Sequence, residues 1–247
     1  MNITDPLAIF FFVLGLVLGS FGNVLIERLP KNKKISGRSQ CPKCKKQLGN
    51  LDLIPIVSFM LLQGKCRHCS ERISNQYPLV ELGSGILFVI ALLITPVSVF
   101  SAIFLAVILW LMLIMSVIDV KTHTIPDALN IPFVILAIIY SYVTGYIPIL
   151  APLIAAGFFF AQWRMSAGKW VGSGDIILAA GIGFLLGNWE YVLVMLGVSY
   201  IAGSLVALPL LFFKKKGEKE HLAFGPFLAI GTLVVLMWGD LILRILI

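Results

Sequence analysis

The longest uncharged stretch of the chain, residues 82–118, constrains the fold most. It runs for 37 residues without Asp, Glu, Lys or Arg, whereas about 20 apolar residues suffice to cross the hydrocarbon core of a bilayer. A single crossing would leave half of this stretch unused. Thr95, Pro96, Val97 and Ser98 supply turn residues near its middle. The stretch therefore predicts two membrane helices joined by a short turn.

Further apolar runs raise the predicted number of membrane helices to eight. Only 13% of the residues are charged, against about 25% in soluble domains, which excludes a water-soluble globule. The first run is interpreted as a retained helix, because a secretory signal would begin with basic residues and end at a small-residue cleavage site. Besides the two helices within 82–118, the expected helices are residues 7–26, two within 128–163 that separate at 144–146, and 176–189, 191–213 and 222–239.

The basic residues predict the orientation of these helices. In a soluble chain the net charge of +7 would suggest nucleic acid. With eight helices and an external amino terminus, however, 18 of the 19 basic residues lie on the cytoplasmic side, as membrane proteins prefer. Arg244 is the exception. The lipid bilayer is therefore the expected surrounding and nucleic acid is not an expected partner. Four of the cytoplasmic residues fall in one loop: Lys214, Lys215, Lys216 and Lys219.

All four cysteines lie in the first cytoplasmic loop, as two C-x2-C pairs. Two such pairs can present four thiolates to one tetrahedral Zn²⁺. The alternative is a pair of disulfides, which the reducing cytosol disfavours. Four thiolates leave no open position for water, so the metal would be structural, and an insert this short needs such a clamp to fold. The predicted ligands are Cys41, Cys44, Cys66 and Cys69.

Three aspartates lie at the expected cytoplasmic ends of membrane helices, namely Asp119, Asp127 and Asp175. Ionisable residues at membrane depth are costly and are functional candidates. Helix capping is the simpler interpretation and suits Asp127 and Asp175, which begin helices. It does not suit Asp119 at a carboxyl end, where the helix dipole disfavours a negative charge.

The short helix expected at residues 176–189 adds an argument for Asp175. Fourteen residues rise about 21 Å, less than the roughly 30 Å hydrocarbon layer, so Asp175 would lie below the membrane surface. The preceding Gly172, Ser173 and Gly174 would permit non-helical backbone and close approach of a peptide. Two aspartates that face one another in such a cavity would share a proton, as in aspartic proteases. The residues alone leave a catalytic pair and two caps equally open.

The ordered set of motifs resembles the bacterial prepilin peptidases, or type IV leader peptidases, whose catalytic part is a GxGD intramembrane aspartic protease. The resemblance covers almost the whole chain. It is carried by residues 19–24 (GSFGNV), 28–30 (RLP), the cysteine pairs, 64–66 (GKC), 77–82 (YPLVEL), Asp119, 125–127 (IPD), 172–175 (GSGD) and 224–230 (FGPFLAI).

This resemblance implies an enzyme of the bacterial inner membrane that cuts the basic leader of type IV prepilins or secretion pseudopilins after a glycine, at the cytoplasmic face. It implies that Asp119 and Asp175 are the catalytic pair and that Asp127 is structural or helps to orient the loop. It further implies methylation of the new amino terminus, often Phe, with S-adenosylmethionine as the methyl donor. No Rossmann-type motif indicates the residues that bind this donor.

The fold expected overall is an all-α polytopic membrane protein with a small cytoplasmic zinc-ribbon-like insert. Its expected parts are a first transmembrane helix at 1–27, the zinc-binding insert at 28–77, which with its flanking helices would form the methyltransferase part, and a membrane-embedded peptidase domain at 78–247. Two functions of other classes compete with the peptidase. One is a proton-coupled transporter or assembly scaffold with a zinc-bound docking insert, and the other is a methyltransferase without protease activity.

Several residues depart from the family pattern or admit two interpretations. Gly22, Gln76 and Ile177 stand where the family has a bulkier apolar residue, Arg and Lys, respectively. Glu81 is interpreted either as an ion-pair or helix-dipole partner or as a residue that binds the methyl donor or the substrate amine. Asn23 is expected to hydrogen-bond across the bundle or to touch substrate.

Overall fold

The structure is a computed structural model that describes residues 5–95, 98–213 and 222–246, without the side chains of 210–213. The chain divides into two compact units, Met1–Ile114 and Met115–Ile247, and the boundary falls within one helix. Pro96 and Val97 of the expected turn lie outside the described residues. So do the expected cytoplasmic lysines Lys214, Lys215, Lys216 and Lys219.

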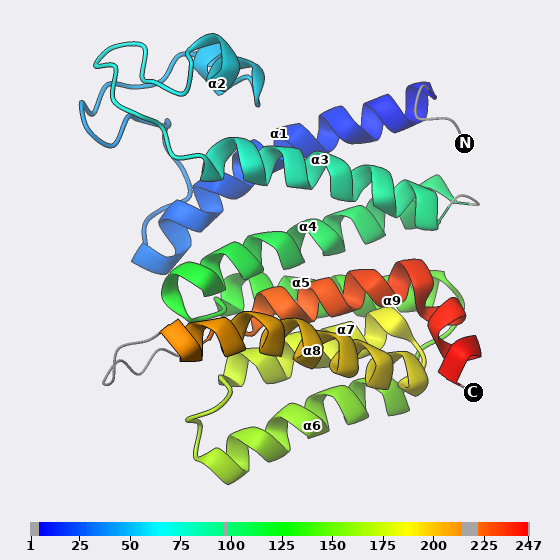
Figure 1. The fold of residues 1–247 in the computed structure, drawn as a ribbon. Coiled ribbons are helices and arrows are strands. Elements are labelled where there is room, and N and C mark those ends of the chain that lie inside the picture. Colours follow the sequence, from blue (N-terminus) through cyan, green and yellow to red (C-terminus); the bar gives the residue numbers. More distant parts are fainter. Residues whose placement is uncertain (1–4, 96–97, 214–221, 247) are drawn as a thin grey trace. The chain divides into compact units, whose positions relative to one another are not determined.

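The regular elements of the described residues are all helical, which confirms the predicted fold class (Figure 1). The only strand-like pairings there are two isolated bridges in the cysteine insert. In chain order the elements are α1 (Pro6–Arg28), η1 (Leu29–Lys31), η2 (Asn50–Leu53), α2 (Val57–Leu61), α3 (Gln76–Ile94), α4 (Val99–Thr122), α5 (Asp127–Val143), α6 (Leu150–Ser166), α7 (Ser173–Leu186), α8 (Trp189–Phe213) and α9 (Gly225–Leu246).

Apart from the short α2, the described α-helices occupy the eight segments expected from the sequence. The expected break at 144–146 is confirmed, because α5 ends at Val143 and Gly145 follows with φ +90°. Five helices are long and apolar enough to cross a membrane, namely α1, α3, α4, α8 and α9. Since α5 and α7 are apolar but shorter, the number of eight crossings stays a prediction.

In the first unit, α1 and α3 pack closely through small residues. A Cβ atom on Gly19 would lie 2.6 Å from the Cα atom of Glu81, so only glycine permits this approach. Phe11 and Phe88 are fully buried across the same interface, with ring centroids 6.4 Å apart. Packing also explains the glycine at residue 22, because a Cβ atom there would collide with the Ile114 side chain of α4.

In the second unit, α7 contacts α5, α6, α8 and α9. Its apolar side chains Leu178, Ala179 and Ile182 are almost completely buried. Within a bilayer, lipid is as apolar as these side chains, so close packing between the helices stabilises their association. The central position of α7 fixes the place of its first turn, which carries Asp175.

Candidate active site and metal centre

Asp119 is buried near the carboxyl end of α4, with 5% of its surface exposed. Its Oδ2 atom accepts a hydrogen bond of 2.9 Å from the backbone N–H of Gly225, the first residue of α9. The first N–H groups of a helix lack partners within the helix and carry partial positive charge. The start of α9 therefore offsets the unfavourable dipole of α4, which explains how a carboxylate is tolerated at this helix end.

Asp175 lies in the first turn of α7, where its Oδ2 atom accepts a hydrogen bond of 3.0 Å from the Gly172 N–H. The capping interpretation is thus correct for one oxygen. The other oxygen, Oδ1, is buried without a hydrogen-bond partner among the described residues. The expected non-helical backbone is limited to Gly172, since α7 already begins at Ser173 and ends at Leu186. A capped Asp175 still has one oxygen available for chemistry.

Asp119 and Asp175 both belong to the second unit. The loop that follows α4 reaches the turn before Asp175, because a Cβ atom on Gly174 would lie 3.1 Å from the Cβ atom of Ile125. Phe224 precedes the Gly225 that binds Asp119, and its ring lies 4.9 Å from that of Tyr200, centroid to centroid. Asp119 of α4 and this aromatic pair, which includes Tyr200 of α8, therefore come together at the start of α9.

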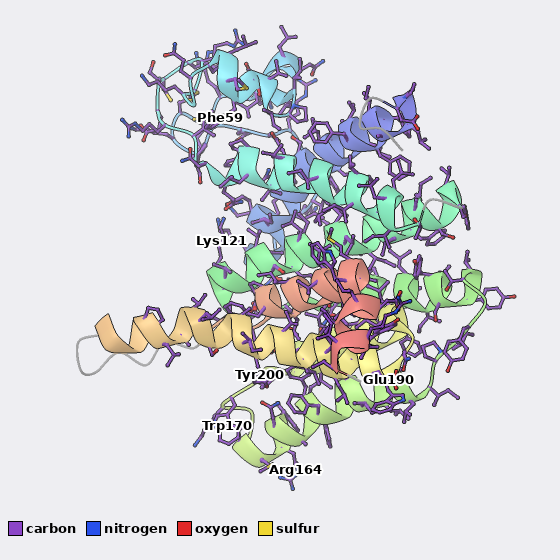
Figure 2. The ribbon with its side chains drawn as sticks, turned by 45° about the vertical axis from the view of Figure 1, so that its right-hand side comes forward. Phe59, Lys121, Arg164, Trp170, Glu190 and Tyr200 are labelled. Atoms are coloured by element: carbon purple, nitrogen blue, oxygen red, sulfur yellow. The ribbon has the colours of Figure 1, made fainter. Side chains whose placement is uncertain are left out.

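Tyr200 was not identified from the sequence, where it is one aromatic residue in a long apolar run. Its hydroxyl donates a 2.9 Å hydrogen bond to Oε1 of Gln162 on α6. Figure 2 shows Tyr200 on α8. The Nε2 atom of Gln162 is buried without a described partner. A polar pair thus links α8 and α6.

Asn130 is the second residue that the sequence analysis missed. It is fully buried, and its Nδ2 atom donates a 2.8 Å hydrogen bond to the carbonyl of Gly174, the residue before Asp175. Its Oδ1 atom is buried without a described partner. An amide in the first turns of an apolar helix was the available signal. Asn130 ties α5 to the turn that orients Asp175.

Asp127 is exposed at the first position of α5, where Pro126 is the N-cap residue. No side-chain hydrogen bond caps this helix end. The Asp127 side chain therefore does not cap α5 through a hydrogen bond. In the first turn of α5, the Asp127 carboxylate can still interact favourably with the helix dipole.

The four cysteines come together as predicted. Their Sγ atoms all lie within 4.8 Å of one another, and the thiols are free rather than paired as disulfides. The Sγ atoms of Cys41 and Cys69 are 3.8 Å apart, close to the roughly 3.8 Å expected between sulfurs that bind Zn²⁺ tetrahedrally at about 2.3 Å. The donor set fits a structural metal ion.

The two cysteine turns have the same backbone geometry. In each, the first cysteine donates a backbone hydrogen bond across the turn, from Cys41 to Lys46 at 3.0 Å and from Cys66 to Glu71 at 2.8 Å. A backbone N–H of Cys44 lowers the pKa of the Cys41 thiol to about 7, whereas burial and the neighbouring thiols raise the pKa of Cys69 to about 11. The four thiols therefore do not ionise alike without a metal, whose binding requires their deprotonation. The residue after the second cysteine has positive φ in both turns, at Lys45 and Ser70.

Two ion pairs join the parts of the insert. Lys43 of the first turn contacts Glu71 beside the second, and Arg67 Nε lies 2.7 Å from Oδ1 of Asp52. Arg67 holds the pKa of the Asp52 carboxyl below its usual value. Such partly exposed pairs contribute roughly 0–1 kcal/mol each, so a metal ion on the four cysteines would be the stronger clamp.

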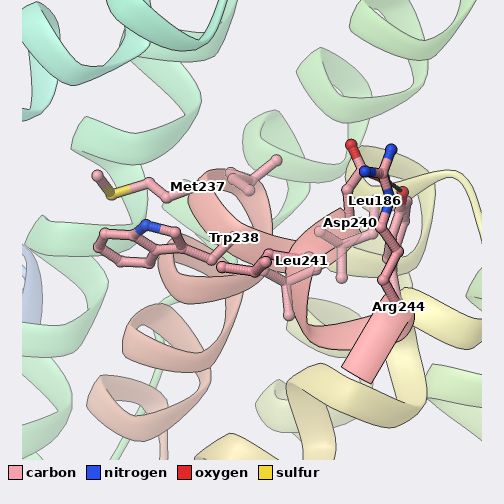
Figure 3. A pocket seen from close by; sticks show the side chains of 10 residues that line it. Leu186, Met237, Trp238, Asp240, Leu241 and Arg244 are labelled. Carbon is pink, nitrogen blue, oxygen red and sulfur yellow. Dashed lines mark hydrogen bonds between the residues drawn. The ribbon is translucent and has the colours of Figure 1, made fainter. Parts of the chain in front are cut away.

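A hollow of about 410 Å³ lies at the other end of α7 from Asp175 (Figure 3). Leu186, Trp238 and Arg244 are among the residues that line it, and the Tyr191 hydroxyl donates a hydrogen bond to Asp240 there. Eleven residues of helix, about 16 Å, separate Leu186 from Asp175. This hollow is therefore not the site of the aspartates.

Comparison with known proteins agrees with this arrangement. The profile of the bacterial peptidase A24 N-terminal domain matches residues 13–95, and that of the type IV leader peptidase family matches residues 106–208. Two relatives have the same name, prepilin leader peptidase/N-methyltransferase. The one from Bacillus subtilis (strain 168) is 33% identical over 94% of this chain and 94% of its own length. The one from Pseudomonas putida is 30% identical over 92% and 89%.

The chain belongs to the type IV leader peptidase family. A relative from Aeromonas salmonicida (strain A449), with the same name, is 29% identical over 94% of this chain and 91% of its own length. No solved structure matches the chain. In this leader peptidase, the second profile includes both Asp119 and Asp175 but ends before Gly225. The hydrogen bond to Asp119 thus comes from a helix outside the matched region.

Proposed function

We propose that this protein is a bifunctional enzyme of the bacterial inner membrane. It removes the leader of type IV prepilins or pseudopilins and then methylates the new amino terminus. The names of the relatives support both activities. The observation that carries the peptidase assignment is the contact between the loop that follows Asp119 and the turn that bears Asp175. This contact supports a common site for two costly carboxylates from distant parts of the sequence.

In the proposed peptidase mechanism, the two aspartates hold one proton between them. The ionised member takes a proton from a water molecule, whose oxygen attacks the scissile carbonyl carbon. The protonated member donates its hydrogen bond and then its proton to that carbonyl oxygen. Collapse of the tetrahedral intermediate breaks the C–N bond, and the amine leaves with a proton returned by the pair.

The hydrogen bonds of the site support these roles. The Gly225 N–H fixes one oxygen of Asp119, and the Gly172 N–H fixes one oxygen of Asp175. Each carboxylate therefore keeps a second oxygen for the substrate or water, and that of Asp175 is buried without a described partner. Fixed donors and acceptors of this kind lower the reorganisation required in the transition state.

The substrate class follows from the family. We propose a peptide with a basic leader that is cut after glycine at the cytoplasmic face, with an external amino terminus for the enzyme. The junction would have to reach the start of α7, where Asp175 lies. The insert at 28–77 with its flanking helices would form the methylating part, and the peptidase domain would extend over 78–247. The separate family profiles over 13–95 and 106–208 support a two-part division.

We propose zinc as the ion held by Cys41, Cys44, Cys66 and Cys69, because four thiolates suit its tetrahedral preference. Bound there, zinc supplies structural stability rather than a reactive water, since all four positions are taken. S-adenosylmethionine is the proposed methyl donor, and no residue of the chain is assigned to it.

The test uses purified full-length protein and a synthetic peptide with a basic leader and a Gly-Phe junction. Asp119→Asn and Asp175→Asn should each reduce cutting by roughly 100-fold or more, with zinc content and helicity unchanged. Asp127→Asn is the matched control, because Asp127 is an exposed aspartate at another helix end, and it should cut within about twofold of the original rate. Normal cutting by either of the first two variants would contradict the proposed mechanism.

A further inference from the structure

The segment between the two cysteine pairs exposes an unusually apolar surface. It contains η2 and α2, and Met60 and Leu61 are 70% and 78% exposed. Contiguous exposed apolar side chains on this scale indicate contact with a partner or a membrane. We call this the η2–α2 surface, and its exposed large apolar residues are Leu51, Leu53, Ile54, Val57, Met60 and Leu61.

A hydrogen bond holds the segment beside a membrane helix. The backbone N–H of Ile56, directly before α2, donates to Oε2 of Glu81 at 2.8 Å. Glu81 is buried in the second turn of α3, which is long and apolar enough to cross a membrane. Glu81 thus binds the insert, which was not among the interpretations drawn from the sequence. Figures 1 and 2 both show α2 above the amino-terminal end of α3.

The backbone conformation of Ile56 indicates that the segment before α2 is held in one defined position. Ile56 has φ +61°, a conformation that β-branched residues rarely adopt. The strained residue stays in place because Glu81 accepts its N–H, and Glu81 Cα is itself packed against Gly19 of α1. The η2–α2 surface is therefore held at the depth where α3 enters the membrane.

The positive charge of the insert indicates an anionic partner. Residues 28–77 contain eleven basic and two acidic residues, and both acidic residues, Asp52 and Glu71, pair with basic residues of the insert. A tetrathiolate zinc centre would subtract only two charges. A surface with apolar side chains and surplus positive charge matches the interface of a bilayer that contains anionic lipids.

We propose that the η2–α2 surface inserts into the headgroup layer of the leaflet at which α3 begins, so that the zinc insert is seated on the bilayer. Apolar side chains at the depth of the second turn of α3 meet the boundary between headgroups and acyl chains. The surplus positive charge of the insert as a whole attracts anionic lipid headgroups. This inference does not depend on the peptidase mechanism.

The test uses the full-length protein in nanodiscs of phosphatidylethanolamine and phosphatidylglycerol. A photoreactive benzoylphenylalanine replaces Leu61 and, as a matched control in the same insert, the exposed Lys46. After illumination, mass spectrometry should find roughly tenfold more lipid adduct at position 61 than at position 46, as expected for a side chain at the acyl boundary. Equal lipid adducts at both positions would overturn the proposal.

Two further measurements keep the result decisive. Zinc content shows that each labelled protein retains its insert, and amide hydrogen exchange tests the unsubstituted protein. Residues 57–61 should exchange several-fold more slowly in nanodiscs with phosphatidylglycerol than in uncharged nanodiscs, because anionic lipid strengthens the docking. Equal exchange would contradict the proposal. A leader peptide that removes the lipid adduct and cross-links at position 61 would show that the surface binds substrate instead.

Discussion

The backbone N–H of Gly225 donates a 2.9 Å hydrogen bond to the buried carboxylate of Asp119. This bond connects the first residue of the last helix with the end of α4, and it directs the positive end of α9 toward a negative charge. A Cβ atom on Gly225 would lie 2.9 Å from Oδ2 of Asp119. The position of the carboxylate therefore depends on the absence of a side chain at residue 225.

Gly225→Ala should displace the Asp119 carboxylate while α9 still forms, because alanine is a good helix residue. A displacement of about 1 Å in a catalytic group costs up to roughly 100-fold in rate, so we expect kcat for leader cleavage to fall between tenfold and 100-fold. Gly197→Ala on α8 is the control, since a Cβ there meets nothing within 4 Å. Equal kcat values for the two variants would show that the contact is unimportant.

Asn130→Leu should slow cleavage without weakening substrate binding. Leucine has nearly the same shape but cannot donate to the Gly174 carbonyl, so the turn before Asp175 loses its 2.8 Å support. We expect kcat to drop roughly tenfold or more and KM to change little, as for loss of positioning. Steady-state kinetics in detergent measure both constants.

Ser141→Ala provides the matched control for Asn130→Leu. Ser141 is also buried on α5 and donates to a backbone carbonyl, that of Tyr146, at the other end of the helix. If this variant loses as much kcat as Asn130→Leu, the effect reflects general stability of α5. A raised KM with normal kcat for Asn130→Leu would instead place Asn130 in substrate binding.

Cys41→Ser should remove bound zinc and reduce methyl transfer more than cutting, because a three-thiolate site holds the insert less firmly. Zinc content per protein and the two product yields on one peptide measure this. His68→Ala is the control, since His68 is exposed between two ligands while four thiolates already complete the site. Equal loss of both activities in Cys41→Ser would refute a separate methylating part.

Much of the fold could be predicted because the apolar runs are long and their interruptions are specific. The break at 144–146 and the cysteine pairs were readable from residue type and spacing alone. Helix ends were less accurate. The sequence predicts a helix at 176–189, after the charge of Asp175, whereas α7 begins at Ser173 with Gly172 as its cap and ends at Leu186.

The candidate site was predictable only in its most costly residues. Asp119 and Asp175 attract notice because charge is rare in membrane helices. Asn130 and Tyr200 do not, because one amide or phenol in an apolar run has no distinctive spacing. Their importance depends on tertiary contacts with Gly174 and Gln162. The same holds for Glu81, whose partner Ile56 lies in a different part of the sequence.

The central claim, that Asp119 and Asp175 act as one unit, is tested most directly by a double-variant comparison. Single-turnover cleavage of the Gly-Phe peptide is measured for Asp119→Asn, Asp175→Asn and the combined variant, with zinc content as the check on folding. Residues that act together lose little more when both are removed, so the combined variant should cut about as slowly as either single variant. The account would be contradicted if the rate reductions of the two single variants multiplied in the combined variant. Normal cutting by either single variant would also contradict it.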